Sequence, residues 1–73
     1  MLHPTEPSTG VLVNGERTET GAASLAELVA QLGHGQEAVA TALNGDFVPR
    51  QARASTPLQP GDRVEILAPR QGG

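Results

Sequence analysis

Seventy-three residues without cysteine, tryptophan or tyrosine leave room for one small domain and for no disulfide framework. A core of this size seldom contributes more than roughly 3 to 5 kcal/mol, so neither a two-domain enzyme nor a deep catalytic pocket is expected. Eight acidic residues oppose five arginines and no lysine, and the formal net charge of −3 disfavours nucleic acid as a partner.

Residues 1–10 hold two prolines and small polar side chains without apolar periodicity, which predicts a mobile N-terminal extension. They lack the basic and apolar regions of a signal peptide. No apolar run in the sequence approaches the roughly 20 residues that a membrane span needs. Together with the lack of cysteine, these features predict a cytoplasmic protein that has no membrane partner.

A β-hairpin is predicted where the fold starts, near Val11. The apolar run 11–13 leads into Asn14-Gly15, a pair that tolerates the positive φ angles of a two-residue type I′ turn. The return strand at 16–20 is polar, which suits the edge of a sheet with one face in water.

A helix follows, and the sequence marks both of its ends. Ser24 and Glu27 have the spacing of a capping box, and apolar residues at 25, 28, 29 and 32 form one stripe along the helix. Gly33 and Gly35 are expected to supply the left-handed positions that end it.

Two further strands are predicted after the helix. The first spans 38–43 and alternates larger side chains with alanines, and a second Asn-Gly pair at 44–45 closes it. The second strand, at 47–49, is cut off by proline, and the polar stretch 50–55 reads as a connection without a clear period.

The last strand is predicted at 63–68, after a turn region at 57–62 in which Gly61 accepts a positive φ. Val64 and Ile66 are expected to face the core, because side chains alternate between the two faces of a strand.

This element order predicts a small α+β domain at 11–68, in which one main helix covers one face of a four- to five-stranded mixed sheet. Strands at both ends of the chain permit the first and the last to pair side by side in the middle of the sheet. That arrangement is the β-grasp, or ubiquitin-like, roll.

Side-chain catalysis finds little support in the sequence. There is no Gly-x-Ser-x-Gly turn, no spacing typical of metal ligands and no phosphate-binding loop with its lysine. Ser24 is better explained as a helix cap, and His34 as a loop residue after the helix. We therefore expect no metal site, no cofactor bound by this chain and no enzymatic activity of its own.

The C-terminal tail at 69–73 offers a different chemistry, because a chain end carries a backbone carboxylate, here at Gly73. An ionised carboxylate is a poor electrophile and must be activated, for example by adenylation with ATP and Mg²⁺. A narrow channel in an activating partner would accept a residue without Cβ, such as Gly72. Gln71 and Arg70 are candidates for recognition by the same partner.

Three apolar side chains, Phe47, Leu58 and Leu67, are candidates for an exposed patch that binds the activating enzyme. Leu67 is out of phase with the expected core positions of its strand. Phe47 is equally suited to fill the core, and that alternative stays open.

Several segments together resemble a known family. They are Val13-Asn14-Gly15-Glu16, Ser24-Leu25-Ala26-Glu27-Leu28, Leu43-Asn44-Gly45-Asp46-Phe47-Val48-Pro49-Arg50, Thr56-Pro57-Leu58, Pro60-Gly61-Asp62-Arg63-Val64-Glu65-Ile66 and Gln71-Gly72-Gly73. In this combination, from about Val11 to Gly73, the chain resembles the ThiS family, the sulfur carrier proteins of thiamine (thiazole) biosynthesis.

The resemblance implies a β-grasp fold whose terminal Gly73 is adenylated by a ubiquitin-activating-like adenylyltransferase, which uses ATP and Mg²⁺. It further implies that a sulfur donor protein converts this end to a thiocarboxylate and that thiazole synthase receives the sulfur. The carrier is then a co-substrate and not an enzyme. The lack of cysteine agrees with sulfur carried on the terminal carbonyl carbon.

Other functions stay open at this point. A sulfur carrier for molybdopterin or cysteine synthesis would share the fold and the diglycine end, although Gln71 and the short chain favour the thiazole branch. A noncatalytic β-grasp interaction module, or a ubiquitin-like modifier attached to protein lysines, represents a different class of function.

Overall fold

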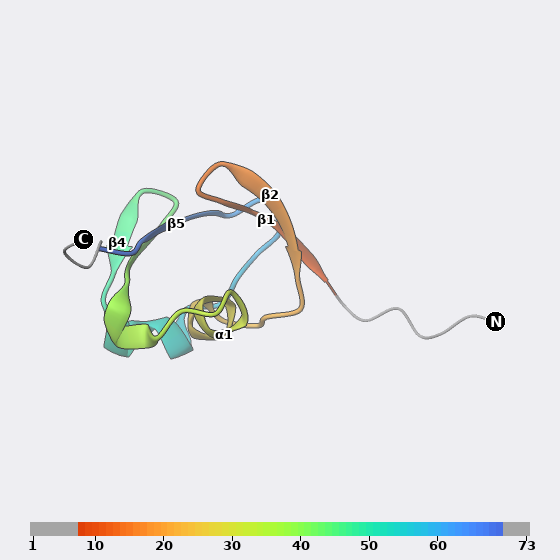
Figure 1. Cartoon of the computed structure of the whole chain (residues 1–73). Helices are drawn as coiled ribbons and strands as arrows, with labels where there is room; N and C mark the ends of the chain where they lie inside the picture. Colours follow the sequence, from red (N-terminus) through yellow and green to blue (C-terminus); the bar gives the residue numbers. More distant parts are fainter. Residues whose placement is uncertain (1–7, 70–73) are drawn as a thin grey trace.

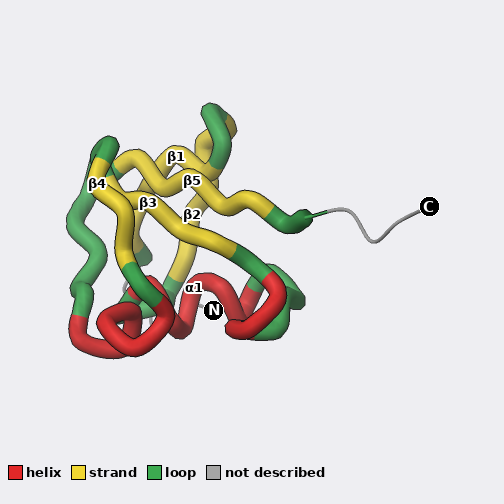
Figure 2. Tube along the Cα trace, turned by 90° about the vertical axis from the view of Figure 1, so that its left-hand side faces the viewer, coloured by secondary structure: helices red, strands yellow, loops and turns green. Residues whose placement is uncertain are grey.

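The structure is a computed structural model that describes residues 8–69. A five-stranded sheet forms one layer, and the helices form the other (Figures 1 and 2). This is the α+β fold with a mixed sheet and one main helix that the sequence predicts. In chain order the elements are β1 (Thr9–Val13), β2 (Glu16–Thr20), α1 (Leu25–Gln31), η1 (Gln36–Ala38), β3 (Ala40–Leu43), β4 (Asp46–Val48), η2 (Arg50–Ser55) and β5 (Arg63–Leu67).

The strand order of the sheet is β2-β1-β5-β3-β4. The first and last strands lie side by side in the middle and run parallel, with Leu12 opposite Arg63 and Val13 opposite Val64. All other neighbouring strands are antiparallel. The predicted β-grasp arrangement is therefore confirmed, with one hairpin on each side of β5.

Each hairpin closes with an Asn-Gly turn of the predicted kind. Asn14 and Asn44 both have φ of 51°, and the glycines that follow have φ of 87° and 90°. Positive φ at both central residues defines a type I′ turn, which matches the twist of the flanking strands. The two turns therefore fix the register of both hairpins.

The two turns also attach their hairpins to β5. The backbone N–H of Ile66 donates to Asn14 Oδ1 at 2.8 Å, and Asn14 Nδ2 donates to the carbonyl of Ile66 at 3.1 Å. On the other side, the N–H of Arg63 donates to Asn44 Oδ1 at 2.8 Å. The asparagine side chains thus satisfy backbone groups at opposite ends of the central strand.

Helix α1 begins at the predicted capping box. The N–H of Glu27 donates to Ser24 Oγ at 3.2 Å, and the N–H of Ala23 donates to the Glu27 carboxylate at 2.9 Å. The first bond satisfies an amide that the first helical turn would leave without a partner, and the second ties the Glu27 carboxylate to the residue just before the N-cap.

The helix ends in a Schellman motif. Gly33 has φ of 88°, its N–H donates to the carbonyl of Ala30, and the N–H of His34 donates to the carbonyl of Val29. Gly35 does not take part, because its φ is −75° and it begins η1 instead. The expectation that both glycines are left-handed is correct for Gly33 and wrong for Gly35.

The hydrophobic core lies between the sheet and α1. It consists of Val11, Ala22, Leu25, Leu28, Val29, Val39, Val48, Leu58, Val64 and Ile66. From α1, Leu25, Leu28 and Val29 are completely buried, and from β5, Val64 and Ile66 face the same layer as predicted. No helix in the described part of the chain is long and apolar enough to cross a membrane.

The strand boundaries differ from the prediction at five places, two of them by a single residue: β4 begins at Asp46 and not at 47, and β5 ends at Leu67 and not at 68. β1 begins at Thr9 and not near Val11, because Thr9 and Gly10 continue the hairpin ladder with β2. β4 ends at Val48, before the proline. β3 begins at Ala40, since residues 36–38 form the 3-10 helix η1 where a strand is predicted from residue 38.

A buried arginine binds the backbone just before β3. Arg53, only 2% exposed, lies on η2, a 3-10 helix where the sequence suggests an irregular connection. It donates to the carbonyls of Gln36 and Val39, both at 2.7 Å, and to Thr41 Oγ1 at 3.0 Å. The Gln36 and Val39 carbonyls therefore bond to the guanidinium and are not available to a strand ladder.

Candidate functional site

The residues expected to carry the chemistry are at the C-terminal end. They are Arg70, Gln71, Gly72 and Gly73, and all four lie outside the described residues. What the structure does describe is where the tail begins. β5 ends at Leu67, opposite Ala40 of β3, and Ala68 and Pro69 are exposed. The tail therefore leaves from the end of the central strand.

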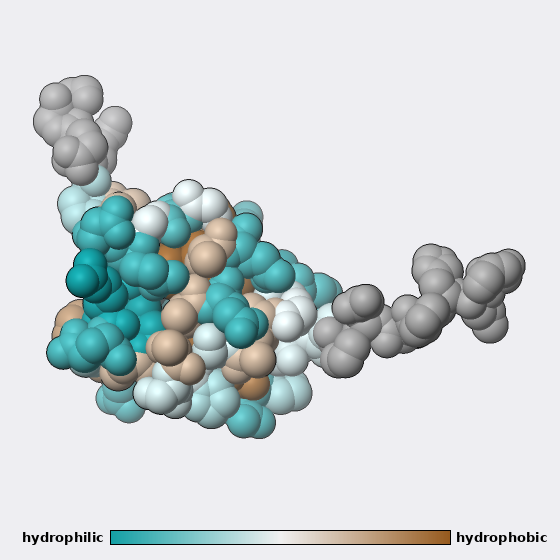
Figure 3. Space-filling model, turned by 90° about the horizontal axis from the view of Figure 1, so that it is seen from below, coloured by the Kyte–Doolittle hydropathy of each residue, from teal (hydrophilic) through white to brown (hydrophobic). Residues whose placement is uncertain are grey.

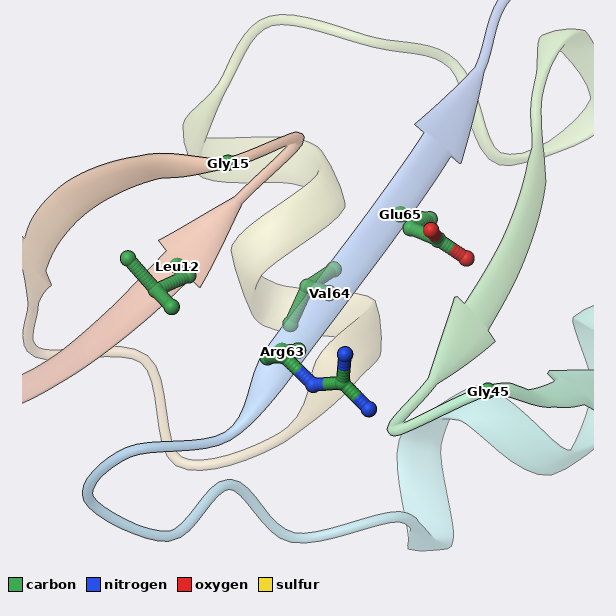
Figure 4. Close-up of a pocket in the computed structure, with 6 residues that line it drawn as sticks. All are labelled: Leu12, Gly15, Gly45, Arg63, Val64 and Glu65. Atoms are coloured by element: carbon green, nitrogen blue, oxygen red, sulfur yellow. The ribbon is translucent and has the colours of Figure 1, made fainter.

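Within residues 8–69, no helix or strand lies over the sheet face opposite α1 (Figures 1 and 2). On β5 this open face carries Arg63, Glu65 and Leu67, all exposed, between the buried Val64 and Ile66. Figure 4 shows Arg63 and Glu65 along β5 with α1 behind the strand. The described residues therefore leave this face exposed.

One half of the open face is apolar. Phe47 is 69% exposed and Leu67 is 70% exposed, although large apolar side chains are usually buried. Ala42 lies opposite Phe47 and Ala40 lies opposite Leu67, and these small side chains leave a hollow between the two large ones. We call Ala40, Ala42, Phe47 and Leu67 the open-face patch.

The exposure expected of Phe47 and Leu67 is therefore confirmed, and the alternative that Phe47 fills the core is not. For Leu58 the expectation of exposure is wrong. Leu58 is 8% exposed and belongs to the core, because its N–H donates to the carbonyl of Ala23 and Pro57 forms a bridge with Ser24. These bonds hold the segment against the start of α1, and Leu58 is therefore not part of the open-face patch.

The other half of the open face is more polar. Leu12, half-buried, lies opposite Arg17 on β2 and opposite Arg63 on β5. Arg17 Nη2 is 3.5 Å from Glu19 Oε2, and both side chains are exposed. A second hollow on this half is lined by Leu12, Gly15, Gly45, Arg63, Val64 and Glu65 (Figure 4).

The opposite side of the molecule carries α1. Seen from the side of α1, hydrophilic groups cover much of the surface and strongly hydrophobic atoms show only in small areas (Figure 3). Within residues 8–69, no three acidic or histidine side chains gather so that they could hold a metal ion. Among the described residues, the open face is therefore the best candidate for a functional surface.

Arg53 is a residue that the sequence did not single out. A lone arginine in a polar stretch without a period gives no signal of burial, since arginine is mostly exposed in proteins. Its guanidinium supports the strand that carries Ala40 and Ala42, through Val39 and Thr41 on either side of Ala40. Arg53 thus lies beneath the open-face patch without being part of it.

Comparisons with known proteins agree with this architecture. Residues 9–73 match the ThiS family. A crystal structure of the thiamine biosynthesis protein ThiS from Geobacter metallireducens is 36% identical, with a TM-score of 0.72, and the match covers 89% of this chain and 100% of that one. An NMR solution structure of a thiamine biosynthesis protein from the same organism is 32% identical, with a TM-score of 0.75 and coverage of 89% and 88%. No curated protein matches the chain.

Proposed function

Because this chain belongs to the ThiS family, whose members are sulfur carriers of thiamine biosynthesis and not enzymes, we propose that Gly73 carries the sulfur as a thiocarboxylate. The observation that supports this most directly is the extent of the family match. It runs from residue 9 through residue 73, so the matched region includes the diglycine end.

The proposed chemistry takes place at the terminal carbonyl carbon. A carboxylate oxygen of Gly73 attacks the α-phosphate of ATP, and pyrophosphate leaves. A ubiquitin-activating-like adenylyltransferase binds the ATP and Mg²⁺, which offset the negative charge of the reacting phosphate. Sulfide supplied by a sulfur donor protein then attacks the activated carbon, AMP leaves, and –C(=O)S⁻ remains on Gly73.

The tail has the length and residue types that this chemistry needs. Five residues from Pro69 to Gly73 span at most about 17 Å when extended, enough to enter an active site while the folded body stays outside. Gly72 has no Cβ and fits a narrow channel. Arg70 and Gln71 offer a guanidinium and an amide for recognition by the partner.

The body is proposed to dock through the open-face patch. Leu67 and Phe47 expose apolar surface that a partner can cover, and Leu67 is the last residue of the strand from which the tail leaves. Contacts at the patch would help to offset the entropy lost when the tail is ordered. We propose that the activating enzyme and thiazole synthase use this face in turn, in the cytoplasm.

Intact-mass measurement tests the proposal. The chain is incubated with ATP, Mg²⁺, the activating enzyme from the same organism and a sulfur donor, and the exchange of one oxygen for sulfur adds about 16 Da. Deletion of Gly73 should abolish this gain and leave the unfolding midpoint unchanged, since residue 73 lies beyond the last strand. A gain of the same size in the deleted chain would refute the assignment of Gly73.

The same measurement separates the alternatives. A ubiquitin-like modifier would give a much heavier protein adduct, and a pure interaction module would give no adduct. Thiazole synthase, added together with the substrates that accept the sulfur, should return the mass of the loaded carrier to its starting value. If only a molybdopterin-forming or cysteine-forming acceptor does so, the carrier serves one of those recipients.

A further inference from the structure

We infer that Glu65 selects partners with a basic side chain in their docking surface. The cation of that side chain, a guanidinium or an ammonium group, would lie among the apolar groups that cover the open-face patch. This inference rests on the proposed function, because it concerns the face through which the carrier is proposed to dock. It adds a stated chemistry to the partner, namely one basic side chain opposite a defined carboxylate.

Glu65 has a central place on the open face. It lies at the middle of β5, which is itself the central strand, and it is exposed. It borders three hollows of this face: one beside Phe47 and Leu67, one beside Leu12 and Arg63 (Figure 4), and one beside Asn14 and Leu67. A partner that covers the patch therefore covers Glu65 as well.

Within residues 8–69 the Glu65 carboxylate has no ion-pair partner. The ion pair found in that range joins Arg17 and Glu19 at the edge of the sheet. Arg63 lies two residues away on the same face, yet its guanidinium does not pair with Glu65. Among residues 8–69, no side chain neutralises this exposed carboxylate, so a cation from a partner can pair with it.

Docking would remove this carboxylate from water. Ala42, a small apolar residue, lies opposite Glu65 on β3, and Phe47 lies beyond it on β4. An unpaired carboxylate that is buried against apolar groups loses its hydration and weakens binding, whereas a cation placed opposite it offsets much of this loss. Glu65 therefore rejects a purely apolar surface and accepts one with a basic side chain.

The charge of the whole chain favours the same partner. The formal net charge is −3, which attracts a basic surface and speeds the encounter with it. The net charge thus attracts a basic surface at long range, and the Glu65 carboxylate selects the position of a cation at close range.

The experiment measures the dissociation constant of the full chain for the activating enzyme from the same organism, without ATP. Glu65→Gln removes the charge and keeps the shape, and we expect binding to weaken about 10-fold or more. Glu65→Lys places a lysine opposite the cation of the partner and should weaken binding about 100-fold or more. Glu37→Gln, an equal change of charge at an exposed residue of η1, is the matched control and should change binding less than about 2-fold.

Equal or tighter binding by Glu65→Gln overturns the inference. The inference is also overturned if Glu65→Gln weakens binding in the unaltered chain but not in a chain that already carries Arg70→Gln. The cation that pairs with Glu65 would then belong to the carrier's own tail. The +16 Da loading of the unaltered chain is a separate readout. Normal loading together with unchanged affinity in Glu65→Gln refutes only the role of Glu65, whereas failure of the unaltered chain to bind or to load refutes the proposed function too.

Discussion

The two faces of the sheet share the same strands and differ in what they do. Along β5, Val64 and Ile66 are buried under α1, while Glu65 and Leu67 on the alternate positions are exposed. One strand therefore belongs to the core on one side and to a proposed docking surface on the other. The comparison teaches that adjacent residues in this protein can be changed with very different consequences.

The difference can be expressed in free energy. Complete burial of a Leu-sized side chain contributes about 1.5 to 3 kcal/mol, and this term applies to α1 and to the covered face of the sheet. Leu67 and Phe47 leave most of their surface in water, so they contribute little to folding. Changes under α1 should thus lower the free energy of unfolding, and changes on the open face should alter partner affinity.

The largest effect on folding is expected from Leu28→Ala, at a side chain with 0% exposure. It should lower the free energy of unfolding by about 2 to 5 kcal/mol, which is comparable to the whole stability of a domain of this size. Leu67→Ala makes the same chemical change on the open face and should cost less than about 0.5 kcal/mol. Urea unfolding followed by circular dichroism measures both, and equal losses would break the comparison.

The next effect is expected from Arg53→Leu. This change leaves the carbonyls of Gln36 and Val39 without their donor in a buried setting, and it should cost about 2 to 3 kcal/mol. Arg50→Leu is the control, because Arg50 is exposed on the same 3-10 helix and should be nearly neutral. The same urea titration applies. Similar midpoints for the two variants would show that the buried guanidinium does not support β3.

A smaller effect is expected at the start of α1. Ser24→Ala removes the acceptor for the N–H of Glu27 and should cost about 1 kcal/mol. Ser24→Thr keeps a hydroxyl oxygen at the cap and should recover most of this loss. Thermal unfolding of the two variants measures the difference. A threonine variant as unstable as the alanine variant would mean that the hydroxyl is not what stabilises the helix start.

The smallest effect on folding is expected from Phe47→Ala, within about 0.5 kcal/mol, because Phe47 is 69% exposed. The same change should weaken binding to the activating enzyme about 10-fold or more, since exposed aromatic anchors often dominate an interface. Calorimetric titration gives the affinity and urea unfolding gives the stability. Unchanged affinity in a normally folded variant would remove Phe47 from the proposed docking surface.

Local signals in the sequence predicted most of the fold. The Asn-Gly pairs require positive φ, Ser24 satisfies an amide of the first helical turn, and the alternation around Val64 sets which residues of β5 face α1. All of these depend on residues within a few positions of one another. The structure confirms each of them for that reason.

The parts that the sequence did not predict depend on distant residues. The backbone before β3 bonds to Arg53, 14 residues after Val39, and the buried Leu58 bonds to the distant Ala23. The pattern of apolar residues within either segment gives no sign of a hydrogen bond to a distant residue. Of the candidate site, Phe47 and Leu67 are exposed as predicted, and Leu58 is not. The central place of Glu65 follows only from the strand order, because neighbours across a sheet are not visible along a sequence.

The position of β5 between two hairpins has a consequence for folding. The β1–β2 and β3–β4 hairpins are formed by neighbouring residues, yet no strand pair joins one hairpin directly to the other. The sheet is therefore complete only once β5, the last of its strands in chain order, has inserted between the two hairpins. Such long-range pairing is slow compared with hairpin formation. We therefore expect the strand from which the tail leaves to join the sheet late in folding.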